Sequence, residues 1–478
     1  MKRIFPLLLI LLPLACNKPA AEQPEPDDGL GGMDPTTYYA NLFAFNNMKA
    51  YYLWADEMAA EIDTWKYGDN PVEKVKACRY NANSQVVDKW TSLMEDCSSF
   101  ESSVTGNGKS FGFDFILTAA ENHVYMVITY VYDSSPASMA GLKRGDVVNT
   151  FDGMELTRSN YSSVLTEKIF DHPGTLQMGM LDERTITMTA VQMYSNPVNV
   201  VRTLTVGNKK VGYLHFSNFT LDACEDLVEA FSQFKANGID ELVVDLRYNG
   251  GGFVTTATVL GSMIAPVSVV SSKAVFTKDI YNSNLTPSME AEAKTLFADS
   301  FTLTLSSGKK TLKTLDVNPD LKRVWFLVTG QTASASEALI CGLVPYMDVT
   351  LIGSNTYGKF CGGYLLKSEE FYDYLASKET KVDAVAGKKA TTGWGLYVIA
   401  SRYADCNGAT LSMPSGIPAD IEALDTPRDG IQLGDPSETM LSYALNYISG
   451  NFVSDKTTKS ASWERLPFEK PGTGALLY

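Results

Sequence analysis

Two side chains in the C-terminal half of the sequence form a pair that could carry out a reaction. Ser334 lies in the segment TGQTASASEAL, just after an apolar run at 323–329, and Lys359 lies in GSNTYGKF, just after a second run at 349–352. A serine hydroxyl needs a base to accept its proton, and a lysine can serve when burial or nearby cations lower its pKa toward about 7–8. Neither segment contains any of the three histidines of the chain, which are His123, His172 and His215. The sequence therefore favours a Ser-Lys dyad over a Ser-His-Asp triad.

Three motifs follow one another in this half of the chain: DLRYNGGG at 245–252, TASASE at 332–337 and TYGK at 356–359. In this order and spacing they resemble the carboxy-terminal processing (tail-specific) serine protease family, whose members carry a DLR-N-GG loop, an SAS-E motif and a GK motif. The resemblance implies that Ser334 is the nucleophile and Lys359 the general base. It also implies an oxyanion hole of backbone amides from Ala335 and from Gly251 or Gly252, and no metal and no cofactor.

Each motif also has a purely structural interpretation. Ser334 and Glu337 have the spacing of a helix capping box, the glycines at 250–252 could form only a tight turn, and a lone lysine is usually a solvated surface charge. The joint occurrence of the motifs favours the catalytic interpretation. One position departs from the family pattern, because many members have a glutamine four residues after the lysine, where this chain has Gly363. The third member of the catalytic group is therefore not identified by the motifs.

The hydrophobic pattern predicts three folded regions in a chain of 478 residues. Residues 35–105 carry apolar and aromatic side chains at helical spacing, which predicts a small helical N-terminal domain. Residues 106–200 are strand-like and include a short helix from Pro136 to Gly141, then a strand at 147–151 and an Asp-Gly turn. Residues 206–450 repeat strand, helix and strand, which predicts an α/β core. Residues 451–478 have the composition of a polar C-terminal tail.

The family resemblance adds expectations about two of these regions. It implies that residues 206–450 form a crotonase-like (ClpP/crotonase-type) protease core and that residues 106–200 form a PDZ-like domain. Gly112 and Phe113 fall where such domains place the loop that binds the terminal carboxylate of a peptide. Because PDZ modules add an extended peptide to a sheet edge, the resemblance implies protein or peptide substrates with free C-termini. The alternative is a β domain that only packs on the protease.

The N-terminus predicts export. Lys2 and Arg3 precede an apolar run at 4–14 that is too short to span a bilayer. Leu14-Ala15-Cys16 resembles a bacterial lipoprotein box, so residues 1–15 are expected to be a signal peptide, Cys16 a lipidated mature N-terminus, and residues 16–34 a flexible tether. Cleavage by an ordinary signal peptidase is the alternative. We expect an exported protein anchored by its lipid to a bacterial membrane, the outer membrane being favoured, at its periplasmic or surface face.

The composition is that of an ordinary globular protein, with 45% hydrophobic and 20% charged residues, so a sizeable core is expected. The net charge of −15 argues against binding to nucleic acid or to an anionic membrane surface. Export would permit disulfides, and Cys78 with Cys97 is the first pair to examine.

Three functions are compatible with these observations. The leading one is a lipid-anchored serine endopeptidase with a Ser-Lys dyad that selects substrates by their C-terminal tails. The second is a catalytically weakened protease-fold protein that acts as a peptide-binding module, an alternative that Gly363 supports. The third is a crotonase-type acyl-CoA enzyme, which the export signal disfavours because acyl-CoA is cytosolic.

Overall fold

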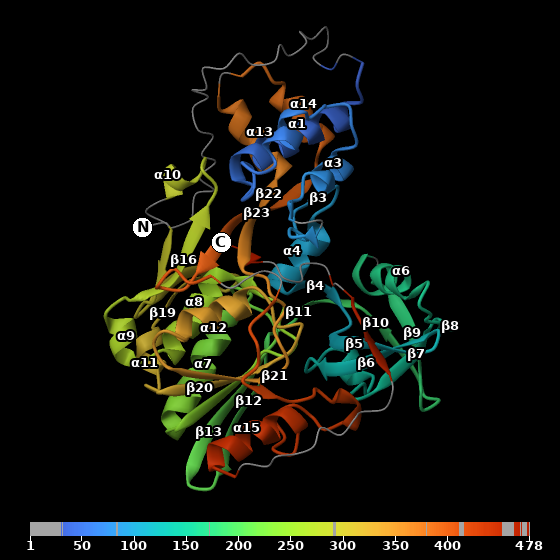
Figure 1. Cartoon of the computed structure of the whole chain (residues 1–478). Coiled ribbons are helices and arrows are strands. Elements are labelled where there is room, and N and C mark those ends of the chain that lie inside the picture. Colours follow the sequence, from blue (N-terminus) through green and yellow to red (C-terminus); the bar gives the residue numbers. More distant parts are fainter. Residues whose placement is uncertain are drawn as a thin grey trace.

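The computed structural model describes residues 30, 32–82, 85–171, 173–289, 293–378, 380–410, 415–451, 463–468, 470 and 476–477. Figure 1 shows three parts: an α/β core, a β domain formed by residues 107–194, and a helical cap. Cys16, the predicted signal peptide at 1–15 and most of the predicted tether at 16–34 lie outside the described residues. None of the helices in the described part of the chain has the length and apolar character that a membrane span requires.

A six-stranded sheet forms the centre of the core, in the order β12-β13-β14-β20-β21-β24. Only β12 runs antiparallel to its neighbour. The strands are β12 (Val198–Val206), β13 (Lys209–Phe216), β14 (Glu241–Asp245), β20 (Arg323–Val328), β21 (Asp348–Gly353) and β24 (Ile421–Glu422).

Helices cover both faces of this sheet. One face packs against α7 (Ala223–Asn237), α8 (Val254–Ile264) and α12 (Ala335–Leu343), and the other against α15 (Thr439–Ser449). Successive side chains of a strand point to opposite faces, so Leu242 and Val244 of β14 enter the first layer and Val243 enters the second. The α/β class predicted for this region is confirmed.

A second, seven-stranded sheet connects the core to the cap, in the order β15-β26-β22-β23-β16-β17 with β3 beside β23. Its strands are β3 (Ser92–Met94), β15 (Gly252–Phe253), β16 (Val275–Tyr281), β17 (Lys294–Leu296), β22 (Cys361–Lys367), β23 (Gly395–Ala404) and β26 (Leu476–Leu477). Smaller elements complete the core: α9 (Val267–Ser271), α10 (Thr286–Met289), β18 (Phe301–Leu305), β19 (Gly308–Leu312), α11 (Thr314–Val317) and the 3-10 turn Pro427–Asp429.

The helical cap combines the N-terminal helices with two helices that follow β22. Its elements are α1 (Pro35–Tyr51), α2 (Ala59–Asp63), α3 (Pro71–Ala77), the short strands β1 (Asn81–Ala82) and β2 (Gln85–Val86), α4 (Ser98–Thr105), α13 (Ser368–Ala376) and α14 (Ala384–Ala390). Figure 1 shows α1 lying beside α13 and α14. The rings of Tyr39 and Tyr372 lie 5.8 Å apart, and those of Phe43 and Phe371 lie 5.6 Å apart.

This cap differs from the separate helical domain predicted for residues 35–105. The apolar side chains of α1 are buried in one cluster with those of α13, β22 and β23. The N-terminal helices therefore have no core of their own, because their apolar faces are completed by residues from the second half of the chain. Cys78 and Cys97 are both buried free thiols.

The β domain is built around a sheet in the order β10-β9-β7-β6-β5-β25, with β8 beside β7. Its elements are β4 (Asn107–Ser110), β5 (Phe113–Ala120), β6 (His123–Val131), α5 (Pro136–Met139), β7 (Val147–Phe151), β8 (Met154–Glu155), α6 (Tyr161–Leu165) with the π-helical turn Thr166–Asp171, β9 (Thr175–Met180), β10 (Thr185–Thr189) and β11 (Val191–Tyr194). The predicted helix from Pro136 and the strand at 147–151 are both present, and Gly141 after the helix has a φ of 80°.

The C-terminal residues also differ from the predicted polar tail at 451–478. Residues Glu464–Leu466 form β25, the edge strand beside β5 of the β domain. Residues Leu476–Leu477 form β26, which runs between β15 and β22 of the second sheet. The polar composition concealed two short strand segments, each of which is stabilised by pairing with a strand from a distant part of the chain.

His215 of β13 is fully buried where the β domain meets the core. Its ring lies 5.0 Å from that of Tyr130 in β6, and its Nδ1 lies 3.2 Å from Asn199 Nδ2. Its Nε2 has no hydrogen-bond partner among the described residues. Burial lowers the pKa of His215 to about 4.

This buried histidine predicts a loss of stability in acid. The unfolded chain binds a proton at His215 near pH 6.5, whereas the folded chain binds it only near pH 4, so the free energy of unfolding should fall by about 3 kcal/mol as the pH falls through this window. Urea unfolding of wild type and His215→Phe between pH 7 and 4 would test this, the variant losing less stability. His123→Gln, at an exposed histidine, should behave as wild type. Equal acid slopes for wild type and His215→Phe would contradict the prediction.

Candidate active site

Ser334 occupies a sharp turn between β20 and α12. It is the N-cap of α12 and has φ 60° and ψ −110°, a strained conformation for a residue other than glycine. Its side chain is fully buried. The residue has the capping-box arrangement with Glu337, yet Ser334 Oγ makes no hydrogen bond of ordinary geometry with the described residues. A buried hydroxyl held in this way is poised for a partner other than the helix it caps.

Lys359 lies in the loop between β21 and β22 and is also fully buried. Its Nζ donates a hydrogen bond to the hydroxyl of Tyr397 in β23, at 3.1 Å. The same nitrogen lies 4.8 Å from the ring centre of Trp90 and 5.1 Å from that of Tyr397. Removing an ammonium from water costs free energy that a neutral amine does not incur to the same extent. The surroundings of Lys359 therefore suit an amine that exchanges a proton.

One carboxylate holds the two segments together. Glu337 accepts hydrogen bonds from the backbone N–H of Ser334 at 2.8 Å, of Gly358 at 2.7 Å and of Lys359 at 2.9 Å. It also accepts one from Thr356 Oγ1 at 2.5 Å. Burial raises the pKa of Glu337, while these four donors act in the opposite direction. The structure thus brings the predicted nucleophile and base into one hydrogen-bonded unit.

Tyr403 of β23 reinforces this unit from the other side. Its hydroxyl lies 3.1 Å from the carbonyl oxygen of Ser334 and 3.1 Å from that of Lys359. The backbone of Ser334 and that of Lys359 are therefore each held at the N–H by Glu337 and at the carbonyl by Tyr403.

The glycine loop after β14 contacts the serine turn through Asn249. The Asn249 carbonyl accepts hydrogen bonds from the N–H of Ala333 at 3.0 Å and from Ser336 Oγ at 3.1 Å. Gly251 and Gly252 have φ values of 114° and 136°, which favour glycine. A Cβ at Gly252 would also lie 2.5 Å from the carbonyl oxygen of Phe219. The loop sequence is therefore required by backbone packing as well as by any role toward a substrate.

The three predicted oxyanion-hole amides differ in their surroundings. Ala335 is the first residue of α12, where the helix itself provides no acceptor for the N–H. The Gly251 N–H already donates to Asn249 Oδ1 at 2.9 Å. This disfavours Gly251 as an oxyanion donor and leaves Ala335 and Gly252 as the better candidates.

Gly363, the position where many family members have glutamine, cannot hold a side chain in this structure. It lies at an irregularity in the β22–β23 pairing, and a Cβ there would be 2.2 Å from the carbonyl oxygen of Val398. The polar contact to Lys359 comes instead from the neighbouring Tyr397. The glycine is thus a consequence of close strand packing.

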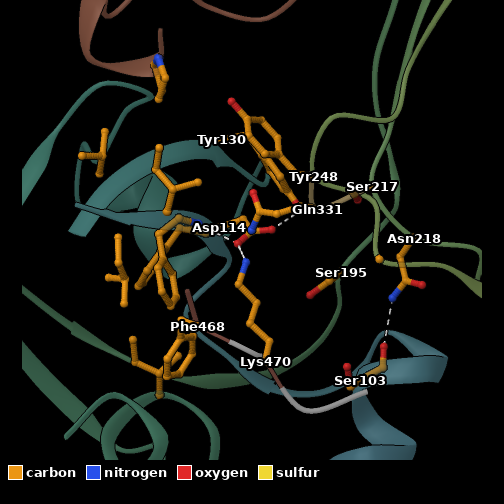
Figure 2. Close-up of a pocket in the computed structure, with 18 of the residues that line it drawn as sticks. Ser103, Asp114, Tyr130, Ser195, Ser217, Asn218, Tyr248, Gln331, Phe468 and Lys470 are labelled. Atoms are coloured by element: carbon orange, nitrogen blue, oxygen red, sulfur yellow. Dashed lines mark hydrogen bonds and ion pairs between the residues drawn. The ribbon is translucent and has the colours of Figure 1, made fainter. Parts of the chain in front are cut away.

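A cavity of about 1330 Å³ lies between the β domain and the core. It extends from the predicted carboxylate-binding residues Gly112 and Phe113 to the glycine loop at 250–252 and to Tyr357. Figure 2 shows Asp114, Phe468 and Lys470 in this cavity. The Gly112 N–H donates to Ser110 Oγ at 3.0 Å, so the first of the two predicted carboxylate donors already has an acceptor.

Comparison with known proteins agrees with the motifs. Residues 210–423 match the model of peptidase family S41. These residues belong to that family. A CtpA-like serine protease of Staphylococcus aureus (strain N315) is 25% identical over 299 residues, which cover 60% of this chain and 51% of that protein. A carboxyl-terminal-processing protease of Synechocystis (strain PCC 6803) is 23% identical over 270 residues, which cover 55% of this chain and 56% of that protein.

A solved structure shows the same fold. The crystal structure of a Bacteroides fragilis NCTC 9343 protein assigned to the S41 proteases has a TM-score of 0.61, with 20% sequence identity, and covers 91% of this chain and 100% of its own. The chain spans only about half the length of the two related sequences.

Several residues of this S41 site were not assigned to it from the sequence. Glu337 belongs to the SAS-E motif but could be taken only for a helix cap. Tyr397, Tyr403 and Trp90 gave no signal, because each lies in an apolar or irregular stretch far from the motifs. Their roles depend on the pairing of β23 with β22 and β3, which no local pattern predicts.

Replacing Glu337 by glutamine should destabilise the S41 site. The amide nitrogen of glutamine would face at least one backbone N–H that now donates to a carboxylate oxygen, so we expect the free energy of unfolding to fall by about 3 kcal/mol. Urea unfolding followed by fluorescence would measure it. Glu57→Gln, at an exposed position of the cap, is the matched control. A Glu337→Gln protein as stable as this control would show that the four hydrogen bonds contribute little.

Proposed function

We propose that this chain is a serine endopeptidase in which Ser334 is the nucleophile and Lys359 the general base. The observation that carries the proposal is the shared carboxylate of Glu337, which binds the backbone of both residues. Membership of residues 210–423 in peptidase family S41 supports the same reaction.

In the first half of the reaction, Ser334 Oγ attacks the carbonyl carbon of the scissile peptide bond. Its proton passes to Lys359 Nζ, and a tetrahedral oxyanion forms. The oxyanion accepts hydrogen bonds from the N–H of Ala335 and of the glycine loop. The C–N bond then breaks, the proton on Lys359 passes to the leaving amine, and an ester to Ser334 remains.

In the second half, water attacks the ester carbonyl carbon while Lys359 accepts its proton. The ester bond to Ser334 Oγ breaks, the proton returns to that oxygen, and the free carboxylic acid leaves. Ser334 Oγ makes no hydrogen bond to Lys359 in the resting structure, so the contact must form when substrate binds. Such tightening is common, because catalytic hydrogen bonds are often long in the absence of substrate.

The β domain is proposed to act as a PDZ-like module that recognises substrate tails. Its strand β5 begins directly after Gly112 and forms one long side of the cavity. An extended peptide could pair with the edge of β5 and follow the cavity toward the glycine loop. Gly112 suits a turn at this place, since it has a φ of 82° and a Cβ there would lie 2.1 Å from Ser135 Cβ.

The place of action that we propose rests on the sequence alone. The basic and apolar N-terminus and Cys16 support export and lipid anchoring to a bacterial membrane, so we propose exported proteins as substrates. The peptide-binding alternative without catalysis rested on Gly363, and that glycine now has a packing explanation.

Cleavage of an unstructured protein by the full chain is the direct test. Ser334→Ala and Lys359→Met should each lower the rate at least about a thousandfold, because they remove the nucleophile and its base. Lys66→Met, at an exposed lysine of the cap, should cleave as wild type does.

Labelling by a serine-reactive fluorophosphonate separates the remaining outcomes. It should modify wild type at Ser334 and leave the Lys359→Met protein unlabelled. A wild-type protein that neither cleaves nor becomes labelled, while still binding peptides, would instead support the non-catalytic alternative.

Tyr397 is proposed as a positioning residue that acts through Lys359. Tyr397→Phe keeps the ring but removes the hydroxyl oxygen that accepts a hydrogen bond from Nζ. We expect kcat to fall about tenfold with little change in KM, and the acidic limb of the pH–rate profile to move to lower pH, because the charged amine loses a stabilising partner. Tyr374→Phe in α13 is the control. A variant with reduced kcat but an unmoved profile would indicate a purely structural role.

A further inference from the structure

The edge of β5, where a peptide would bind, is already occupied by the chain's own C-terminal segment. Strand β25 runs antiparallel to β5, with Leu466 opposite Leu117, Arg465 opposite Thr118 and Glu464 opposite Ala119. This is the geometry of peptide recognition by strand addition. The described C-terminal segment, residues 463–468 and Lys470, therefore lies in the place of a ligand.

Side chains of this segment enter the groove at alternate positions, as they do in a strand. Leu466 is buried in the hydrophobic cluster of the β domain. Two residues later, the ring of Phe468 lies 5.9 Å from that of Phe115 and 5.9 Å from that of Phe170. The backbone carbonyl of Pro467 accepts a hydrogen bond from Tyr161 at 3.3 Å. The strand β5 and the helical turn beyond α6 thus enclose the segment from two sides.

The next alternate residue, Lys470, occupies the end of the groove beside the predicted carboxylate-binding loop. Its ammonium contacts the carboxylate of Asp114 and lies 4.8 Å from the ring centre of Phe115. Figure 2 shows Lys470 pointing toward Asp114 across the cavity. A carboxylate at this place attracts the cation of a lysine side chain. This end of the groove is suited to a lysine side chain.

The opposite face of the segment contacts the core. Arg465 donates a hydrogen bond to Gln331 at 2.8 Å, three residues before Ser334, and lies 3.8 Å from Asp425. The ring of Trp463 lies between Tyr125 of the β domain, at 4.3 Å, and the guanidinium of Arg428, at 3.8 Å. The segment therefore bridges the β domain and the S41 core.

We propose that residues 463–468, together with Lys470, are an internal ligand of the β-domain groove, and that a substrate segment must displace them to bind. The inference rests on the peptide-binding role proposed above. It also defines the ligand class: an extended peptide with apolar side chains two positions apart, the second aromatic, followed two positions later by a cation.

The contacts of the segment suit a ligand that is held but can be replaced. Among the described residues of the segment, three pair with β5. The ion pair of Glu464 with Arg158 is exposed, where such pairs contribute little. Tethering compensates, because a covalently linked segment competes at an effective concentration of about millimolar. A free peptide of the same sequence should therefore bind the intact protein weakly, and a protein with a weakened segment much more tightly.

The test uses the octapeptide Trp-Glu-Arg-Leu-Pro-Phe-Glu-Lys, labelled with fluorescein and amidated at its C-terminus, and the full chain carrying Ser334→Ala. Fluorescence anisotropy should show at least tenfold tighter binding when the protein also carries Leu466→Ala and Phe468→Ala. A peptide with alanine at its own Leu and Phe positions should not bind either protein. Adding Val385→Ala, at an exposed residue of α14, should leave the affinity unchanged. Equal affinity for the two proteins, or binding to neither, would overturn the proposal.

Hydrogen exchange tests the same idea without altering the segment. In the Ser334→Ala protein, the amides of Glu464–Leu466 should be protected and should exchange at least tenfold faster at millimolar unlabelled octapeptide. Unchanged protection would mean that the segment is not displaced. Because neither experiment requires cleavage, a failed protease assay and a failed displacement test can be told apart.

Discussion

The buried carboxylate of Glu337 is the constraint on which the geometry of the site depends. Four donors surround it. An ionised carboxylate only accepts hydrogen bonds, whereas a protonated one carries an O–H that needs an acceptor, so four donors favour the ionised form. Leaving such a charge buried without these partners would be costly. The β20–α12 turn and the β21–β22 loop must therefore converge on Glu337, and this convergence sets the unusual backbone of Ser334 and the burial of Lys359.

A second buried charge cluster couples this site to the β domain. Arg247, which follows β14, is fully buried and binds Asp245 and Glu438 through both edges of its guanidinium, with distances of 2.7 to 3.0 Å. Arg144 of the β domain reaches the same cluster, donating to the hydroxyl of Tyr248 at 2.7 Å and lying 3.2 Å from Asp425. Paired groups of this kind tolerate little displacement, because breaking one pair leaves a buried charge. The glycine loop and the β domain are thus held in register.

Sequence reasoning succeeded where the determinants are local. The alternation of strand and helix around β13, α7 and β14 predicted the core, and Pro136 and Gly141 predicted the bounds of α5. Sequence reasoning failed where side chains are buried by residues that are distant in the sequence. The aromatic residues on one face of α1 have the same helical spacing whether the helix belongs to an independent bundle or packs on α13. Tyr397 cannot be linked to Lys359 until β22 and β23 are paired. The residues around Leu466 and Phe468 are mostly polar, so the sequence did not predict a strand there. The two apolar side chains are nevertheless enough to anchor an edge strand on the β domain.

The resting arrangement also explains how recognition and reaction could share one path. Ser334 and Lys359 are fully buried, and the cavity reaches the glycine loop and Tyr357 without being lined by either of them. Two strands among the described C-terminal residues pair near this cavity: β25 pairs with β5, and β26 pairs with Gly252 of β15 and with Gly363 of β22. A peptide that replaced both strands would be held at β5 while an upstream or downstream stretch paired beside the predicted oxyanion loop. Displacement of the internal segment would then free the groove that reaches the glycine loop.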